Sequence, residues 1–154
     1  MNHAYVYDRT TASARRTCTD LLRGNVPAFP LEPDAFDPTF ETGGVPHLIV
    51  TELDMLPVDG LDLIRQVRAF WSAVELPIVV YTSSVDPETF AAAMAAGANE
   101  LVNRDAPDAA ERLSAAVERC LRRTIPALSA PQPAVPIDGF RRMLASTLGF
   151  RRAA

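Results

Sequence analysis

The sequence contains no lysine, and all 15 of its basic residues are arginine. Lysine carries a compact ammonium on a flexible stem, whereas arginine carries a planar guanidinium that suits paired contacts with a carboxylate. The absence therefore excludes any mechanism that needs a lysine ammonium.

Cysteine and histidine are almost absent as well. Cys18 and Cys120 have no CxxC or Cys/His spacing around them, so we expect two core residues, with a disulfide as the minor alternative in a cytosolic chain. His3 and His47 have no partner at a metal-ligand spacing in the sequence. Neither histidine indicates a zinc site or a catalytic triad.

Long hydrophobic runs are absent too. None approaches the ~18 apolar residues of a membrane span, and the opening M-N-H-A-Y-V-Y-D lacks a basic and then apolar leader. The net charge of −4 argues against nucleic acid as the main partner, because phosphate binding usually requires a basic surplus. With 48% hydrophobic and 22% charged residues, the chain is expected to bury one core as a soluble, cytoplasmic protein.

What the sequence does contain is an alternation of short apolar runs with segments of helical period. Leu61, Ile64 and Val67 illustrate the helical spacing. This alternation predicts a doubly wound α/β domain, in which a parallel sheet is covered by helices on both faces. The runs that indicate strands are residues 4–7, 26–31, 47–51, 76–81 and 101–102.

One connection departs from the alternation. Residues 32–46 hold three prolines and two adjacent glycines where the second helix should lie. We predict that this helix is short or replaced by a loop. A harmless surface variation is the favoured interpretation, and a remodelled partner surface bearing Phe36 and Phe40 is the alternative.

Polar residues follow the predicted strands at the edge where such sheets bind ligands. The first strand ends at Tyr7-Asp8, the third at Glu52, the fourth at Thr82-Ser83 and the fifth at Arg104. Together they predict a small cluster of two carboxylates, a hydroxyl and a guanidinium.

Three segments carry a resemblance to a known family. They read P-H-L-I-V-T-E-L-D-M-L-P-V-D-G, L-P-I-V-V-Y-T-S and A-G-A-N-E-L-V-N-R-D. In this order, and at these separations, the chain resembles the receiver domain of bacterial two-component response regulators over about residues 4–123. The resemblance implies a flavodoxin-like sheet of five strands in the order 2-1-3-4-5 and a role in signal transduction or a phosphorelay.

The resemblance also assigns family roles to individual residues. Glu52 stands where the family has the aspartate that accepts the phosphoryl group, and Arg104 stands where it has a lysine. The family's pair of Mg²⁺-binding acids is reduced to Asp8, because Tyr7 occupies the first position. Two further positions complete the comparison, with the usual hydroxyl present at Thr82 and the aromatic switch replaced by Leu101.

These replacements predict a loss of phosphorylation. Glutamate extends the carboxylate by roughly 1.5 Å, and a misplacement near 1 Å can cost about 10²-fold in a reaction that depends on positioning. With one acid lost, Mg²⁺ is expected to bind only weakly at Asp8 and Glu52, and no other cofactor is expected. We predict instead an ion pair between Glu52 and Arg104.

The resulting hypothesis is a stand-alone pseudo-receiver that works through protein contacts of its last two helices and its tail. A histidine kinase or another signalling protein is the expected partner, with a homodimer as an alternative. Whether Glu52 mimics the activated state or fills a dead pocket stays open. The competing hypothesis is a phosphorylatable switch that uses Asp54 or Asp8, and a small flavodoxin-like enzyme ranks last because no glycine-rich phosphate loop is present.

The sequence also suggests three parts to the chain. We predict a receiver-like domain over residues 1–123, a Pro/Ala-rich extended linker over 124–136 and an amphipathic helical tail over 137–154. The tail is expected to pack on its own domain or a symmetry mate, then on a partner, and least of all on a membrane surface. Its apolar face consists of Ile137, Phe140, Leu144 and Leu148.

Overall fold

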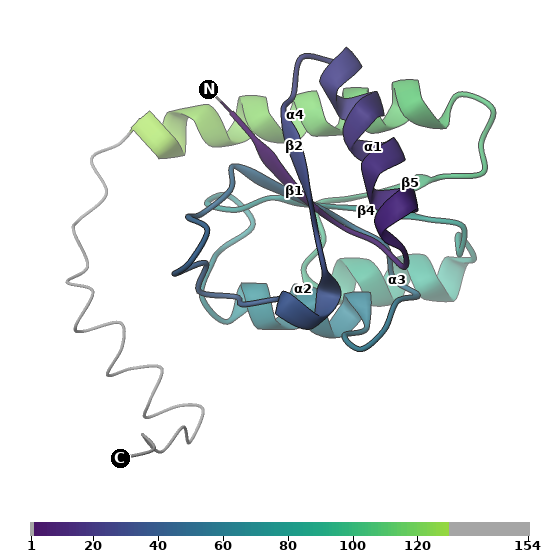
Figure 1. The fold of residues 1–154 in the computed structure, drawn as a ribbon, viewed down its shortest axis with the longest axis horizontal. Coiled ribbons are helices and arrows are strands. Elements are labelled where there is room, and N and C mark those ends of the chain that lie inside the picture. The colour runs from purple at the N-terminus through teal and green to yellow at the C-terminus, as the bar shows by residue number, and fades with distance from the viewer. Residues whose placement is uncertain (1, 130–154) are drawn as a thin grey trace.

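A computed structural model describes residues 2–129 of the chain, with side chains as far as Thr124. Its centre is a five-stranded, all-parallel sheet in the order β2-β1-β3-β4-β5, as predicted (Figure 1). The strands are β1 (Ala4–Tyr7), β2 (Ala28–Leu31), β3 (Leu48–Thr51), β4 (Ile78–Thr82) and β5 (Glu100–Asn103). The α-helices are α1 (Thr11–Arg23), α2 (Gly60–Arg68), α3 (Pro87–Ala96) and α4 (Ala109–Ser129).

The helices cover both faces of the sheet in two pairs. In Figure 1, α1 and α4 lie on one side of the strands, and α2 and α3 lie on the other. Residues of β1, β3 and β4 are buried on both sides, so alternate side chains feed two separate hydrophobic clusters. Val50 packs with Leu113 and Val117 of α4, whereas its neighbour Ile49 packs with Leu63 of α2. This two-sided burial explains why the three central strands are nearly continuous apolar runs.

The second helix of the predicted alternation is replaced by irregular chain, as the proline and glycine content indicated. Only a short 3-10 helix, Pro33–Ala35, lies between β2 and β3. Phe36 and Phe40 turn inward against the sheet, and Phe36 meets the ring of Tyr7 edge-on at 5.5 Å between centroids. Phe40 is buried and Phe36 is partly buried, so both rings help to fill the space beside the strands, and Phe40 is not available to a partner.

The boundary of the last helix differs from the prediction. α4 continues to Ser129, so residues 124–129 are helical and do not begin an extended linker. Thr124 is buried, and its hydroxyl donates to the carbonyls of Cys120 and Leu121, which shows that the packed face of α4 extends past Arg123. The rest of the predicted linker and the tail, with Ile137, Phe140, Leu144 and Leu148, lie outside the described residues and stay predictions.

Both cysteines are free, and Cys120 is buried beside α1 and the sheet, as expected of a core residue. No helix among residues 2–129 combines the length and the apolar content that crossing a bilayer requires.

Candidate functional site

The candidate site lies at the carboxyl edge of the sheet, where the parallel register brings three strand ends together. Tyr7 pairs with Thr51, so the residues that follow them, Asp8 and Glu52, emerge side by side. Thr82 pairs with Asn103 on the other half of the sheet, so the next residue, Arg104, enters the same place from β5. The sheet topology therefore gathers side chains that are distant in sequence.

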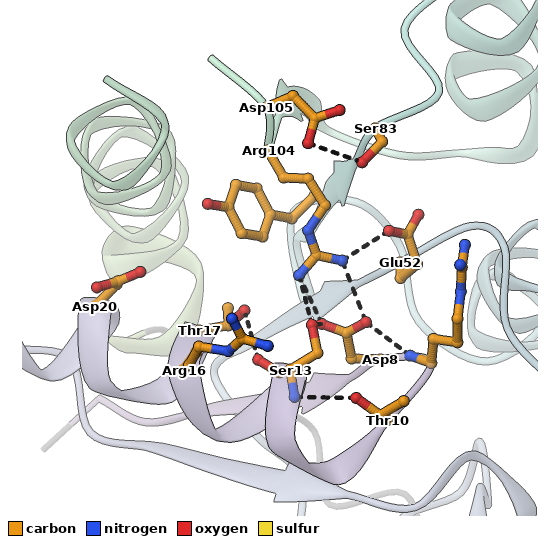
Figure 2. Close-up of a pocket in the computed structure, with 12 residues that line it drawn as sticks. Asp8, Thr10, Ser13, Arg16, Thr17, Asp20, Glu52, Ser83, Arg104 and Asp105 are labelled. Carbon is orange, nitrogen blue, oxygen red and sulfur yellow. Dashed lines mark hydrogen bonds and ion pairs between the residues drawn. The ribbon is translucent and has the colours of Figure 1, made fainter. Parts of the chain in front are cut away.

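Arg104 forms the centre of the cluster, and its fork points at both carboxylates (Figure 2). Its Nη1 donates to Glu52 Oε2 at 2.7 Å and to Asp8 Oδ1 at 3.2 Å. Its Nη2 donates to Asp8 Oδ2 at 2.8 Å and to the hydroxyl of Ser13 at 3.0 Å. The predicted ion pair between Glu52 and Arg104 is thus confirmed, and Asp8 joins it as a second, bidentate partner.

The two carboxylates are enclosed and fully engaged. Glu52 and Asp8 each expose about 4% of their side chains. The second oxygen of Glu52, Oε1, accepts from the backbone N–H of Leu53 at 2.7 Å. Asp8 also accepts from the backbone N–H of Arg9 at 2.7 Å and from the Ser13 hydroxyl at 2.8 Å. Each of the four carboxylate oxygens therefore has a partner within the protein.

The charges in this cluster stabilise one another. Burial alone would raise the pKa of Asp8, but the hydrogen bonds from Arg104 and Ser13 outweigh it and hold that pKa below its usual range. Burial likewise opposes the charge on Arg104, yet the hydrogen bonds to Asp8 and Glu52 raise the pKa of its guanidinium. Both shifts favour the ionised pair at neutral pH.

A cavity of about 480 Å³ opens above the cluster. Tyr81 forms one wall, with the Arg104 guanidinium 4.9 Å from the centre of its ring. One turn of α1 forms another wall through Ser13 and Thr17, with Asp20 further along the helix. These α1 residues were not predicted as part of the site, although they recur at the helical spacings of four and three.

The hydroxyl of the cluster is not the one that the sequence predicted. Thr82 is buried, and its Oγ1 accepts from the backbone N–H of Ser84 at 3.2 Å, away from the ion pair. Ser13 supplies the hydroxyl instead, and Figure 2 shows it beside Asp8. Ser83 lies at the rim, where its hydroxyl donates to Asp105 at 3.1 Å.

Three other predicted residues lie away from the cavity. Tyr7 points into the core on the α2–α3 side, and burial raises the pKa of its hydroxyl. Leu101 packs half-buried on that same side of the sheet. Asp54 is exposed and pairs with Arg9 at 2.5 Å. Strand geometry accounts for Tyr7 and Leu101, because neighbouring residues on a strand point to opposite faces.

The residues present do not suit Mg²⁺, which demands oxygen ligands in near-octahedral geometry. Arg104 places its positive charge between the carboxylates of Asp8 and Glu52 and occupies the oxygens that would coordinate a metal. Within residues 2–129, no group of three or more histidine, cysteine or acidic side chains is arranged to hold an ion. The guanidinium of Arg104 is itself the cation of the cluster.

No family model and no curated protein matches this sequence. Solved structures do match. The receiver protein of a response regulator from Pseudomonas putida shares 22% identity at a TM-score of 0.65, covering 77% of this chain and 96% of that one. The receiver domain of Francisella response regulator 1452 shares 17% identity at a TM-score of 0.65, covering 80% and 99%.

The chain has the fold of a response-regulator receiver domain. A third match is described as a probable two-component system response regulator/GGDEF domain protein, with 22% identity and a TM-score of 0.72 over 80% of this chain. This chain spans about half the length of that protein, 50% of which is covered. The structural similarity at these identities establishes the receiver fold alone. The chemistry of the site is inferred from the residues described above.

Proposed function

We propose that this receiver-like domain is a pseudo-receiver, a cytoplasmic protein-interaction module in signal transduction that works without phosphorylation. The observation that carries the proposal is the 2.7 Å ion pair between Glu52 and Arg104, which sits where a receiver would hold its acceptor aspartate and its lysine. The ion pair fills the phosphorylation site with the protein's own charges.

The hydrogen bonding of Glu52 argues against its acting as a nucleophile. A carboxylate that attacks phosphorus needs a free oxygen lined up with the leaving group. Here Oε2 is bound to Arg104 and Oε1 to the Leu53 N–H, so an attack would first have to break one of these contacts. Arginine also stays protonated at any physiological pH, so the pair persists across that range.

The surroundings of the ion pair favour a static scaffold over an imitation of the activated state. Coupling the site to the surface would require the Thr82 hydroxyl to follow the charge at Glu52. Thr82 instead bonds to the backbone of Ser84, and the neighbouring switch position is the aliphatic Leu101. No contact among the described residues links the Thr82 hydroxyl to the ion pair. We therefore infer a pocket held in one state.

The proposed contact surface includes the outward side of α3. Phe90 and Met94 lie one helical turn apart and are both exposed, as is Val85 just before the helix. Exposed apolar residues gathered in this way indicate a place where another protein packs. A histidine kinase or another signalling protein is the partner that this proposal expects, and a second copy of the chain is the alternative.

A phosphorylatable switch remains the second candidate, and Asp54 is the observation in its favour. Asp54 lies two residues after Glu52 and is exposed, so a phosphodonor could reach it. Its partner, however, is Arg9 at the surface, and it is absent from the lining of the cavity that Glu52 shares with Asp8. Asp8 is the weaker acceptor of the two, because both its oxygens are bound to Arg104.

The test is to incubate the full chain with Mg²⁺ and a small-molecule phosphodonor and to measure the intact mass. We expect no added phosphoryl group on the native protein. A revertant that carries Glu52→Asp and Arg104→Lys runs beside it, and Asp54→Asn serves as the matched control. A phosphoryl group on the native chain would overturn the proposal, and its loss in Asp54→Asn would establish the second candidate instead.

A further inference from the structure

The two histidines of the chain meet at the edge of the sheet opposite the ion pair. Ala4 pairs with Leu48 where β1 and β3 begin, so the residues just before them, His3 and His47, lie next to each other. The hydrogen bonding between β1 and β3 continues to these two residues, because the His47 N–H donates to the His3 carbonyl at 3.0 Å. Residues that are 44 positions apart in sequence thus form a side-by-side pair.

The imidazole nitrogens of this pair converge. The two Nδ1 atoms are 3.2 Å apart, and the ring planes are nearly perpendicular at 80°. Two imidazole nitrogens bound to one tetrahedral Zn²⁺ at about 2.0–2.1 Å would lie roughly 3.3 Å apart. The separation of the two nitrogens therefore matches that of a two-histidine chelate. Nδ1 of His47 also accepts from the backbone N–H of His3 at 3.2 Å, and a bound ion would replace this contact.

The surroundings leave the pair accessible. Both histidines are only partly buried. The His3 ring lies beside Tyr5, which belongs to the cluster on the α2–α3 side of the sheet, and His47 directly follows the irregular segment 32–46. Phe29 meets the His3 ring and is itself about half exposed, which indicates that this corner of the sheet is open.

We propose that His3 and His47 form a two-imidazole binding site for a divalent transition-metal ion of the Zn²⁺ type. The site is separate from the carboxylate cluster, because it lies at the other end of β1 and β3 and offers nitrogen in place of oxygen. Imidazole is a ligand that zinc, copper and nickel accept, whereas Mg²⁺ prefers oxygen. Within residues 2–129 no third histidine, cysteine or acidic ligand completes the set, so water would fill the other positions of a bound ion. A bound ion would join the first and third strands of the sheet.

Zn²⁺ alone is the probe, titrated into the full chain while the imidazole signals are followed by nuclear magnetic resonance. The chain has only two histidines, so both rings can be observed without overlap. We expect the signals of both rings to shift together and to saturate at one equivalent. His47→Gln should weaken binding by at least about tenfold, comparable to or greater than the loss of an outer-shell partner at a metal site.

Three controls make the outcome decisive. The double variant Cys18→Ser, Cys120→Ser removes the thiols and should leave the affinity for Zn²⁺ unchanged. Asp8→Asn removes one carboxylate of the cluster and should also leave that affinity unchanged. His3→Gln should weaken binding as much as His47→Gln. The proposal is overturned if the two ring signals stay in place at saturating Zn²⁺, if only His3 responds, or if His47→Gln binds as tightly as the native chain. In those cases the 3.2 Å contact is a simple hydrogen bond between neutral rings.

Discussion

Two arginines tie distant parts of this domain together by different chemistry. Arg104 enters the carboxyl edge of the sheet and is bound by two carboxylates. Arg68, the last residue of α2, contacts only neutral oxygens among the described residues. Its Nε donates to the Gly97 carbonyl at 2.8 Å, its Nη1 to the Leu76 carbonyl at 2.8 Å and its Nη2 to Asn99 Oδ1 at 2.9 Å.

The difference appears in the direction of their pKa shifts. Partners of opposite charge raise the pKa of Arg104, whereas burial without a carboxylate lowers that of Arg68 to about 10. Arg68 joins the ends of α2 and α3 and needs only hydrogen bonds to do so. Arg104 neutralises two buried carboxylates at the candidate site. Arg68 therefore serves the fold, whereas Arg104 carries the proposed function.

Removing Arg104 should have the largest effect. We expect Arg104→Ala to lower the free energy of unfolding at pH 7 by about 3–5 kcal/mol, because it leaves two buried carboxylates without their cation. Arg104→Lys should cost less, roughly 1–2 kcal/mol, since it keeps the charge and loses the fork. Urea unfolding of the three proteins measures both, and a loss below about 1 kcal/mol for Arg104→Ala would show that the cluster is solvated.

The pH dependence sharpens this prediction. The pKa of Asp8 is lowered in the folded state, so its carboxylate stabilises the native protein above the unfolded value of about 4. This stability is lost as the pH falls through the folded pKa. Arg104→Ala removes the cause of the shift, so its deficit against the native protein should shrink in acid. A deficit that stays constant from pH 7 to pH 3 would contradict the assignment.

Arg68→Ala should be the next most damaging change. We expect a loss of about 2–3 kcal/mol, because the carbonyls of Gly97 and Leu76 lose their donor in a partly buried position. The loss should not vary between pH 4 and pH 8, since no carboxylate is involved. Urea unfolding across that range separates the two arginines, and a pH-dependent loss would mean that Arg68 has a charged partner in solution.

The ion pair of Arg104 could be predicted from the sequence, whereas the role of Arg68 could not, for a physical reason. Carboxyl ends of parallel strands meet at one edge, so Asp8, Glu52 and Arg104 could be placed together from strand order alone. The partners of Arg68 are backbone carbonyls, which every residue has and which no pattern of side chains marks. A different limit concealed His3 and His47, whose contact depends on the register of β1 against β3.

Side-chain direction set another limit. Tyr7 and Thr82 were assigned to the pocket from their position at strand ends, but alternation along the strand turns Tyr7 into the core. Ser13 was not predicted because it lies in the first turn of α1 and not at the end of a strand. The existence of the five strands and the missing second helix were predicted correctly, since they follow from runs, period and proline content. The order of the sheet was also predicted correctly, but it followed from the resemblance to receiver domains.

Gly97→Ala tests the packing of Arg68 from the opposite side. Gly97 ends α3 with φ at +114°, and an added Cβ would lie 2.7 Å from Cγ of Arg68. We expect a loss of about 1–3 kcal/mol from backbone strain and the displaced arginine. Gly44→Ala is the matched control, because Gly44 also has positive φ at +78° but has no atom within 4 Å of the new Cβ. Gly44→Ala should lower the free energy of unfolding by less than Gly97→Ala. Equal losses would show that the Arg68 side chain moves aside at little cost.

The smallest effect is expected at the surface pair between Arg9 and Asp54. This pair has the same chemistry as the one between Arg104 and Glu52, but its side chains are 61% and 75% exposed, against 18% and 4%. Water solvates both partners before and after the pair breaks, so Asp54→Asn should change the free energy of unfolding by less than about 1 kcal/mol. Urea unfolding at low and at high salt measures it. A loss as large as that of Arg104→Ala would mean that burial does not set the strength of ion pairs in this domain, and the contrast between the buried cluster and an ordinary surface contact would lose its basis.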